Sequence, residues 1–266
     1  MYRERPFAEE PMRIAWTSSA LLLFACAGAQ KQPAADDERA RAQQIVDAAD
    51  RTPEDRALDP GRKPVETLVF LHLRPGMRVA ELGAGGGYTT ELMARAVAPG
   101  GVVYAQNPDI FIQRFLKTSW PARLARPAMK NVVRVDREFE DPLPPEAKDL
   151  GLVLINVIYH DVAYMNVDRD KMNKAVFDAL KPGGAYVVID SSAKEGTGTS
   201  DAQTLHRIDE QVVRSEVQRA GFKLQAEGDF LRNPQDTRDW NSSPPAAAAA
   251  GRRGTSDRFA LRFVKP

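Results

Sequence analysis

Residues 79–92 read VAELGAGGGYTTEL and decide the fold, because an apolar run is followed by four glycines in five positions and then by a helix-like stretch. An apolar strand that ends in glycines and enters a helix presents unpaired backbone N–H groups and the positive end of the helix dipole. Glycine also permits positive φ and lets a ligand approach the backbone closely. The stretch therefore predicts a ligand-binding loop between a strand over Arg78–Leu82 and a helix over Tyr88–Val97.

Outward from this loop, strands alternate with helices. Further strands are predicted over Gly101–Ala105, Val132–Val135, Leu150–Val157, Ala185–Asp190, Phe222–Glu227 and Phe259–Val264, and helices over Ile110–Leu116, Lys171–Leu180 and Ile208–Ala220. Such alternation is typical of a three-layer α/β fold, with a mostly parallel sheet covered on both faces. The last two strands have no helix between them, so an antiparallel pair is expected at the end of a seven-stranded sheet.

Three other segments have their own predictions. Asp36–Arg56 is expected to begin with a helix and to end in an irregular stretch that runs to Gly61. Pro64 favours the first position of a helix that carries Val65, Leu68 and Leu71. Arg232–Asp257 contains five alanines between proline and glycine flanks, and these flanks favour a mobile loop.

Length and composition limit the range of functions. The 266 residues suit one α/β domain with tails, and a 43% hydrophobic content is enough for a core. Lys and Arg number 37 against 36 Asp and Glu, which leaves a formal net charge of +1. We see no basic stripe interleaved with aromatic residues, so no nucleic-acid partner is expected.

Two common ligands of glycine loops fit the sequence poorly. A phosphate-binding P-loop needs Gly-Lys-Ser or Gly-Lys-Thr, whereas Gly87 is followed by Tyr88 and Thr89. The dinucleotide fingerprint needs a glycine or alanine three positions after its second glycine, and Tyr88 stands there. A nicotinamide-dependent oxidoreductase is therefore the least favoured of the three functions that we consider.

The pattern Glu81-x-Gly83-x-Gly85-x-Gly87, followed by Leu-Lys-Pro-Gly-Gly at residues 180–184, resembles the class I S-adenosylmethionine-dependent methyltransferases. The resemblance implies a Rossmann-like methyltransferase fold whose last strand is antiparallel, with S-adenosylmethionine as the cofactor. It also implies that the loop wraps the methionine part of the cofactor and that the acidic residue orders the site. The cofactor residues that it implies around the loop are Glu81, Gly83, Ala84, Gly85, Gly87 and Tyr88.

The same resemblance implies which residues contact the ribose and the adenine of the cofactor. An acidic residue usually takes the ribose hydroxyls at the end of the second strand, but here Asn107 stands at that point, so the contact would lack charge assistance. Glu138 and Phe139 are the residues implied for the adenine, after the third strand. Asn156 ends the fourth strand and is expected beside the cofactor.

Residues just after the fourth strand should face the transferred methyl group, because ligands of open parallel sheets bind beyond the carboxyl ends of the strands. His160 has a pKa suited to removing a proton from an oxygen or nitrogen acceptor at neutral pH, with Asp161 or a backbone carbonyl to fix its tautomer. His206 is expected in a loop that covers the pocket. A metal-dependent O-methyltransferase is a further alternative, with Asp161 and Asp190 as candidate Mg²⁺ ligands. Resemblance to that subgroup implies another strong oxygen ligand where Ser191 and Ser192 stand, so no metal is predicted.

An apolar segment near the start indicates export. Residues 14–29 read IAWTSSALLLFACAGA, which is short for a membrane span but suits the core of a signal peptide. The only cysteine, Cys26, ends the sequence Leu-Phe-Ala-Cys, which resembles the lipobox of bacterial lipoproteins. That resemblance implies lipidation of Cys26 after cleavage.

The expected organisation follows from these segments. Residues 1–29 are expected to be a signal and lipobox segment, with Met12 as an alternative start. Residues 30–60 are expected to form a polar tether and a helix, and residues 61–266 the methyltransferase domain. The expected location is the periplasmic side of the cell envelope, with membrane contact only through the lipid on Cys26. A cytoplasmic location is the alternative if the cysteine pattern is not a lipobox.

Two functions are carried forward. The first is methyl transfer from S-adenosylmethionine to an unidentified small molecule by in-line displacement, which depends mainly on alignment. The second is a non-catalytic, envelope-anchored binding protein on a methyltransferase scaffold, since one fold hosts many functions. Asn107 in place of an acid favours the second, and the intact glycine loop favours the first.

Overall fold

Seven strands form one sheet in the order β3-β2-β1-β4-β5-β7-β6 in a computed structural model that describes residues 35–266. The strands are β1 (Arg78–Leu82), β2 (Val102–Asn107), β3 (Val132–Asp136), β4 (Leu150–Asn156), β5 (Leu180–Ser191), β6 (Lys223–Gly228) and β7 (Arg258–Val264). β1 to β5 pair in parallel, whereas β7 runs antiparallel to both β5 and β6. The predicted α/β fold with an antiparallel last strand is confirmed.

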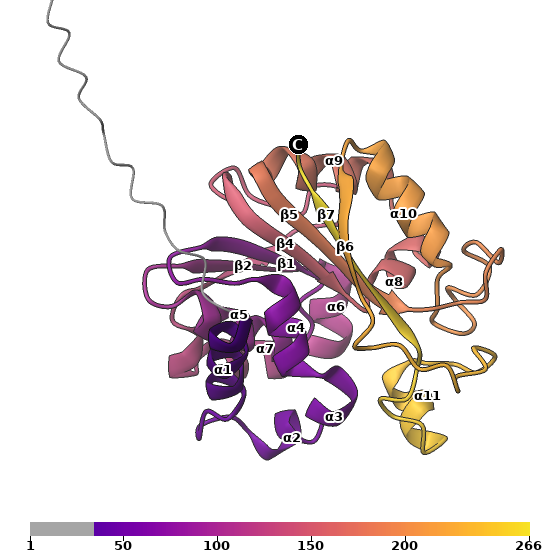
Figure 1. Ribbon diagram of the computed structural model, residues 1–266, viewed down its shortest axis with the longest axis horizontal. Coiled ribbons are helices and arrows are strands. Elements are labelled where there is room, and N and C mark those ends of the chain that lie inside the picture. Colours follow the sequence, from indigo (N-terminus) through magenta and orange to yellow (C-terminus); the bar gives the residue numbers. More distant parts are fainter. Residues whose placement is uncertain (1–34) are drawn as a thin grey trace, which may run out of the picture. The chain divides into compact units, whose positions relative to one another are not determined.

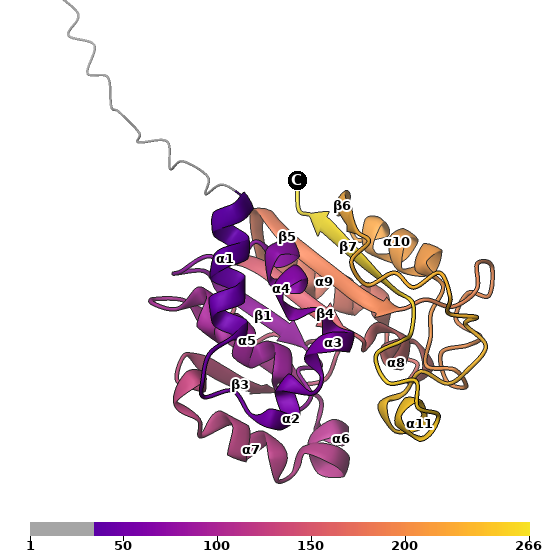
Figure 2. The same ribbon diagram turned by 60° about the horizontal axis from the view of Figure 1, so that its bottom comes forward.

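Helices cover both faces of the sheet (Figures 1 and 2). One face packs against α1 (Ala35–Val46), α4 (Pro64–Leu71) and α5 (Tyr88–Val97), and the other against α8 (Tyr159–Tyr164), α9 (Arg169–Ala179) and α10 (Glu210–Arg219). Neighbouring strand residues alternate between the two cores: Leu152 and Leu154 face the first, and Val153 and Ile155 face the second. All four are fully buried, as expected for a central parallel strand.

The segment between β2 and β3 forms a third, smaller core beside the glycine loop. It contains α6 (Asp109–Phe111), the π-helix η1 (Ile112–Leu116), α7 (Ser119–Leu124) and the 3₁₀-helix η2 (Pro127–Met129). Leu116, Trp120 and Met129 pack against Ala84 and Ala105. This small core packs against the glycine loop through Ala84.

Several helices differ from the expectation. The stretch predicted as irregular contains α2 (Pro53–Arg56), where Thr52 accepts a hydrogen bond from the Asp55 N–H at 3.1 Å, and α3 (Asp59–Arg62). The segment predicted as a mobile loop contains α11 (Pro244–Ala249). α7 and α8 were not anticipated either. One or two turns of helix carry too little periodicity to read from sequence, and they depend on tertiary packing.

The order of the strands reverses between β1 and β4, which lie side by side although two helical segments and two strands separate them in the chain. Ligands of open α/β sheets bind at such a point, beyond the carboxyl ends of the strands. The glycine loop follows β1 and the stretch 157–161 follows β4, so both lie at this crevice. The fold therefore brings the predicted cofactor loop and the predicted acceptor residues to the same end of the sheet.

The predicted signal segment, with Met12 and Cys26, lies outside the described residues. Between residues 35 and 266, no helix combines the length and the apolar character that crossing a bilayer requires.

Candidate active site

The glycine loop has the strained backbone that its composition predicts. Gly83, Gly85 and Gly87 have φ values of +63°, +56° and +81°, a region that residues with a side chain rarely adopt. A Cβ on Gly83 would lie 2.7 Å from Cγ2 of Ile158, so the chain after β4 packs directly against the loop. At Gly86, a Cβ would meet no atom within 4 Å. The base of the loop is thus tightly packed, and its tip faces open space.

The end of β2 holds the loop in place. The N–H of Gly83 donates to Oε1 of Gln106 at 2.9 Å, and the N–H of Ala84 donates to the Gln106 carbonyl at 2.9 Å. Oδ1 of Asn107 accepts from the Gly85 N–H at 2.8 Å, and its Nδ2 donates to the Gly85 carbonyl at 3.3 Å. Both ends of the buried Asn107 amide are therefore occupied. The amide keeps a second N–H and its oxygen a second lone pair, and its contact with ribose stays a prediction.

Glu81 lies inside the sheet, below the loop. Its Oε2 accepts a hydrogen bond from the Thr90 hydroxyl of α5. Burial raises the pKa of Glu81 to about 7, although the Thr90 hydrogen bond and the nearby charge of Arg62 act against this rise. The carboxyl thus links β1 to the first turn of α5 and, from its position, orders the loop rather than facing the open crevice.

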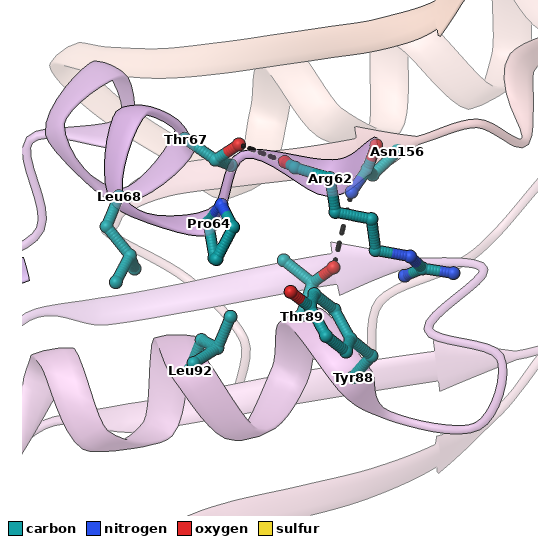
Figure 3. Close-up of a pocket in the computed structure, with 8 residues that line it drawn as sticks. All are labelled: Arg62, Pro64, Thr67, Leu68, Tyr88, Thr89, Leu92 and Asn156. Atoms are coloured by element: carbon teal, nitrogen blue, oxygen red, sulfur yellow. Dashed lines mark hydrogen bonds between the residues drawn. The ribbon is translucent and has the colours of Figure 1, made fainter. Parts of the chain in front are cut away.

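A pocket of about 250 Å³ lies between the start of α4 and the start of α5 (Figure 3). It is lined by Arg62, Pro64, Thr67, Leu68, Tyr88, Thr89, Leu92 and Asn156. Asn156 reaches across from β4 and donates to Oγ1 of Thr89 at 3.2 Å. The pocket is thus formed by the starts of α4 and α5 and by the end of β4.

Arg62 was not singled out from the sequence, where no motif marks it. Its guanidinium lies 4.5 Å from the ring centroid of Tyr88, whose hydroxyl donates to Asp59 at 2.6 Å. The Arg62 side chain makes no hydrogen bond or salt bridge with any residue from 35 to 266. Burial lowers the pKa of Arg62, which carries a positive charge without a carboxylate partner beside the pocket.

Arg258, at the start of β7, is a second guanidinium near this crevice. It donates to Oγ of Ser256 at 3.1 Å and to the Gly61 carbonyl at 3.4 Å. Burial and the charge of Arg62 lower the pKa of Arg258 to about 10, while Asp190 acts in the opposite direction. Two guanidinium groups therefore lie close together without a salt bridge in the described part of the chain, which favours an anionic ligand.

His160 lies in the first turn of α8, the helix that follows β4, and its side chain is buried. Its Nδ1 lies 2.7 Å from Oδ1 of Asp190 at the end of β5, and its backbone N–H donates to Oδ2 of the same carboxylate at 2.9 Å. Burial lowers the pKa of His160, but the charge and hydrogen bond of Asp190 outweigh it, so the pKa is raised. Asp190, and not Asp161 or a carbonyl, thus fixes the tautomer, and this part of the prediction is wrong.

The other imidazole nitrogen of His160 lies next to His206, whereas the predicted role of the His206 loop as a cover of the pocket stays a prediction. Nε2 of His160 lies 3.2 Å from Nδ1 of His206, and Oδ1 of Asp161 lies 3.5 Å from each of these nitrogens. His206 and Val157 both have positive φ, of +50° and +59°. Such a conformation is uncommon for any residue with a side chain and is a clear outlier for valine, and outliers of this kind gather at functional sites.

The two residues predicted for the adenine lie beyond β3, next to the end of β2. Oε1 of the exposed Glu138 accepts from the Asp109 N–H at 3.2 Å. Phe139 is fully buried and packs edge-on against Phe111, with ring centroids 6.0 Å apart. Glu138 is accessible to a ligand, whereas the Phe139 ring is already covered by protein, so its contact with adenine stays a prediction.

Comparisons with known proteins agree with this architecture. No protein-family model matches the chain. The chain is 28% identical over 154 residues to the rat "rRNA 2'-O-methyltransferase fibrillarin". The aligned region covers 55% of this chain and 44% of fibrillarin. The chain thus spans less than half the length of the curated relative.

Solved structures match over most of the chain. A SAM-dependent methyltransferase from Aquifex aeolicus has a TM-score of 0.55 at 16% identity and covers 88% of this chain and 100% of its own. An arsenic(III) S-adenosylmethionine methyltransferase from Chlamydomonas reinhardtii has a TM-score of 0.53 at 14% identity, covering 85% and 73%. With the strand order and the glycine loop, these matches lead to one conclusion: the chain has the fold of the class I S-adenosylmethionine-dependent methyltransferases.

Proposed function

We propose that this protein transfers a methyl group from S-adenosylmethionine to a small molecule. The observation that carries the proposal is the meeting of two features where the strand order reverses. One is a glycine loop whose tip faces open space, and the other is the Asp190–His160 pair after β4. A methyltransferase needs a cofactor cradle and an acceptor site side by side, and this crevice offers both.

The residues around the loop fit the cofactor. Most N–H groups of the loop donate within the chain, so the N–H groups at the start of α5 are the ones that favour polar and anionic groups. Arg62 has no carboxylate partner among residues 35–266, so it would hold the carboxylate of the cofactor's methionine part. When bound, S-adenosylmethionine supplies an electrophilic methyl group on a sulfonium. Glu81, Thr90 and Gln106 keep the loop in the shape that leaves its tip open.

On the acceptor side, Asp190 keeps the proton on Nδ1 of His160 and leaves the lone pair on Nε2. That nitrogen faces His206 and Asp161 rather than the core. It is placed to take a proton from an oxygen or nitrogen acceptor, which would otherwise attack the methyl group poorly. His160 is therefore our candidate catalytic residue.

We favour a small acceptor over a nucleic acid because positive and negative charges nearly balance over the whole chain. Fibrillarin is named for its action on rRNA, but that action belongs to fibrillarin. Methyl incorporation into an RNA pool with none into small-molecule extracts would overturn this preference.

We further propose that the enzyme acts at the cell envelope through a lipid on Cys26, which rests on the sequence pattern around that cysteine. Labelled fatty acid should be incorporated by the parent chain and not by Cys26→Ser. Equal labelling of the two would overturn the anchor.

Calorimetric titration with S-adenosylhomocysteine tests the cofactor site. The parent chain should bind with a micromolar Kd, and Arg62→Met should weaken binding by about tenfold, which corresponds to about 1.4 kcal/mol. Arg39→Met is the matched control, because Arg39 is exposed and pairs with Glu66 away from the pocket. Absence of binding by the parent at millimolar ligand would refute the enzyme and leave the non-catalytic binding protein.

A further inference from the structure

We propose that His160, Asp161 and His206 bind a transition-metal cation, with zinc the best fit. The binding itself does not depend on the proposed function, whereas the part that the cation plays in methyl transfer rests on it. The sequence predicted no metal because it offered only carboxylates for Mg²⁺. The two imidazoles stand 46 residues apart in the chain, and only the fold brings them together.

The three ligand atoms form a nearly equilateral triangle. Its edges are 3.2 Å between Nε2 of His160 and Nδ1 of His206, and 3.5 Å from each of these to Oδ1 of Asp161. In a tetrahedral zinc site with bonds of about 2.1 Å, neighbouring ligand atoms lie about 3.4 Å apart. The octahedral geometry of Mg²⁺ would bring them to about 3.0 Å. The triangle thus matches one face of a zinc tetrahedron and leaves the fourth position open.

Hydrogen bonds between neutral imidazoles leave one of the three atoms unsatisfied. In neutral His160, Asp190 holds the proton on Nδ1, so Nε2 has a lone pair, and the single proton of a neutral His206 can serve only one of its two neighbours. The Asp161 carboxylate is mostly buried and makes no hydrogen bond with the part of the chain that the structure describes. A cation satisfies all three atoms at once.

The surroundings of the triangle resemble those of metal sites in general. Metal-binding histidines commonly donate their other N–H to a carboxylate, which fixes the ring and raises its basicity. Asp190 does this for His160 at 2.7 Å, and its two oxygens also accept from the backbone N–H groups of His160 and Ser191. Asp190 is therefore a positioning residue and not a ligand.

His206 is held in place from its other side. Its backbone has a φ of +50°, and its carbonyl accepts a hydrogen bond from Oγ of Ser242 at 2.7 Å. The Ser242 N–H donates to the Leu205 carbonyl at 2.9 Å. The segment before α11 thus fixes the uncommon conformation that points His206 at His160.

A cation at this place would bind the oxygen of the acceptor at its open position and favour loss of the acceptor proton to water. The acceptor oxygen would then form its bond to the methyl carbon as the bond from that carbon to sulfur breaks, leaving a neutral thioether. Nε2 of His160 would serve as a ligand in place of accepting the proton itself. A cation at this place would thus favour acceptors with a hydroxyl or another oxygen nucleophile.

Titration of the metal-free full chain with Co²⁺ tests the site without any methyl donor, because tetrahedral cobalt has characteristic visible absorption bands. All proteins carry Cys26→Ser, which removes the only thiol. We expect one Co²⁺ per chain, its displacement by Zn²⁺, and affinity weakened more than about tenfold in His206→Ala and His206→Gln. His72→Ala is the matched control, since His72 is the remaining histidine and contacts Glu38.

Absence of tetrahedral bands in the parent, or bands of equal strength in both His206 variants, would overturn the metal site. Circular dichroism on each variant separates lost binding from lost folding, and the Gln variant keeps a polar side chain if the Ala variant unfolds. Cobalt binding without S-adenosylhomocysteine binding would leave the metal site standing and refute methyl transfer. The reverse result would refute the metal site alone.

Discussion

Replacement of Glu81 by Gln tests whether the carboxyl below the glycine loop is held in its neutral form by the fold. Glu81 is 3% exposed, and burial raises its pKa from the ordinary 4.5 to about 7. Each pKa unit corresponds to about 1.4 kcal/mol, so this difference corresponds to about 3 kcal/mol. Gln has nearly the same shape and its amide oxygen can accept the Thr90 hydroxyl, so the change removes mainly the ionisation.

The sign follows from proton binding. Between pH values of about 4.5 and about 7, the folded chain holds this proton more tightly than the unfolded chain, so the free energy of unfolding falls as the pH rises. Glu81→Gln has no proton to lose at this position. The free energy of unfolding of the variant minus that of the parent should therefore increase by about 3 kcal/mol from about pH 4 to about pH 8.

Urea unfolding at several pH values, followed by tryptophan fluorescence, measures this difference, and the contributions of all other groups cancel. Glu138→Gln is the matched control, because the Glu138 carboxyl keeps its contact with water in the folded chain. The difference in the free energy of unfolding between Glu81→Gln and the parent could instead change by less than about 1 kcal/mol from about pH 4 to about pH 8. That result would refute the raised pKa of the buried carboxyl.

Two further substitutions test the packing that shapes the site. Gly83→Ala places a Cβ 2.7 Å from Cγ2 of Ile158 on a backbone with a φ of +63°, so it should lower the free energy of unfolding by about 1–3 kcal/mol and weaken S-adenosylhomocysteine binding. An unchanged Tm and Kd would argue against this close approach. Asp236→Ala leaves the fully buried guanidinium of Arg207 without its carboxylate at 2.8 Å, and it should cost about 3–5 kcal/mol in urea unfolding. A loss under about 1 kcal/mol would show that this ion pair does not hold the segment before α11.

The elements around the glycine loop could be predicted because their causes are local. β1 and α5 begin and end where the sequence placed them, since an apolar run, a set of glycines and a helix-forming stretch follow one another without a gap. Alternation of strands and helices then fixed the class of fold, because helices must cover both faces of a parallel sheet. His160 and the loop residues were predicted in the same way, by their positions just after strands.

The short helices could not be predicted, because their stability comes from distant contacts. The segment 232–257 illustrates this: its proline, glycine and alanine content favours a loop, yet Asp236 accepts from Arg207, from Trp240 and from the backbone of Asp257. These bonds connect the segment to the loop before α10 and to the start of β7. Composition describes the segment alone and carries no information about partners elsewhere in the chain.

The sequence by itself determined the fold class and the bounds of the glycine loop, and it predicted an acceptor site after the fourth strand. Only the tertiary structure decided that Asp190 and not Asp161 orients His160 and that His206 lies beside His160. It also decided that the Asn107 side chain is hydrogen-bonded to Gly85. The reason is physical. A pattern along the chain reports which residues are buried or turn the backbone, whereas a contact between residues 30 or 46 positions apart depends on strand order and register. The whole core sets these, and no local stretch contains them.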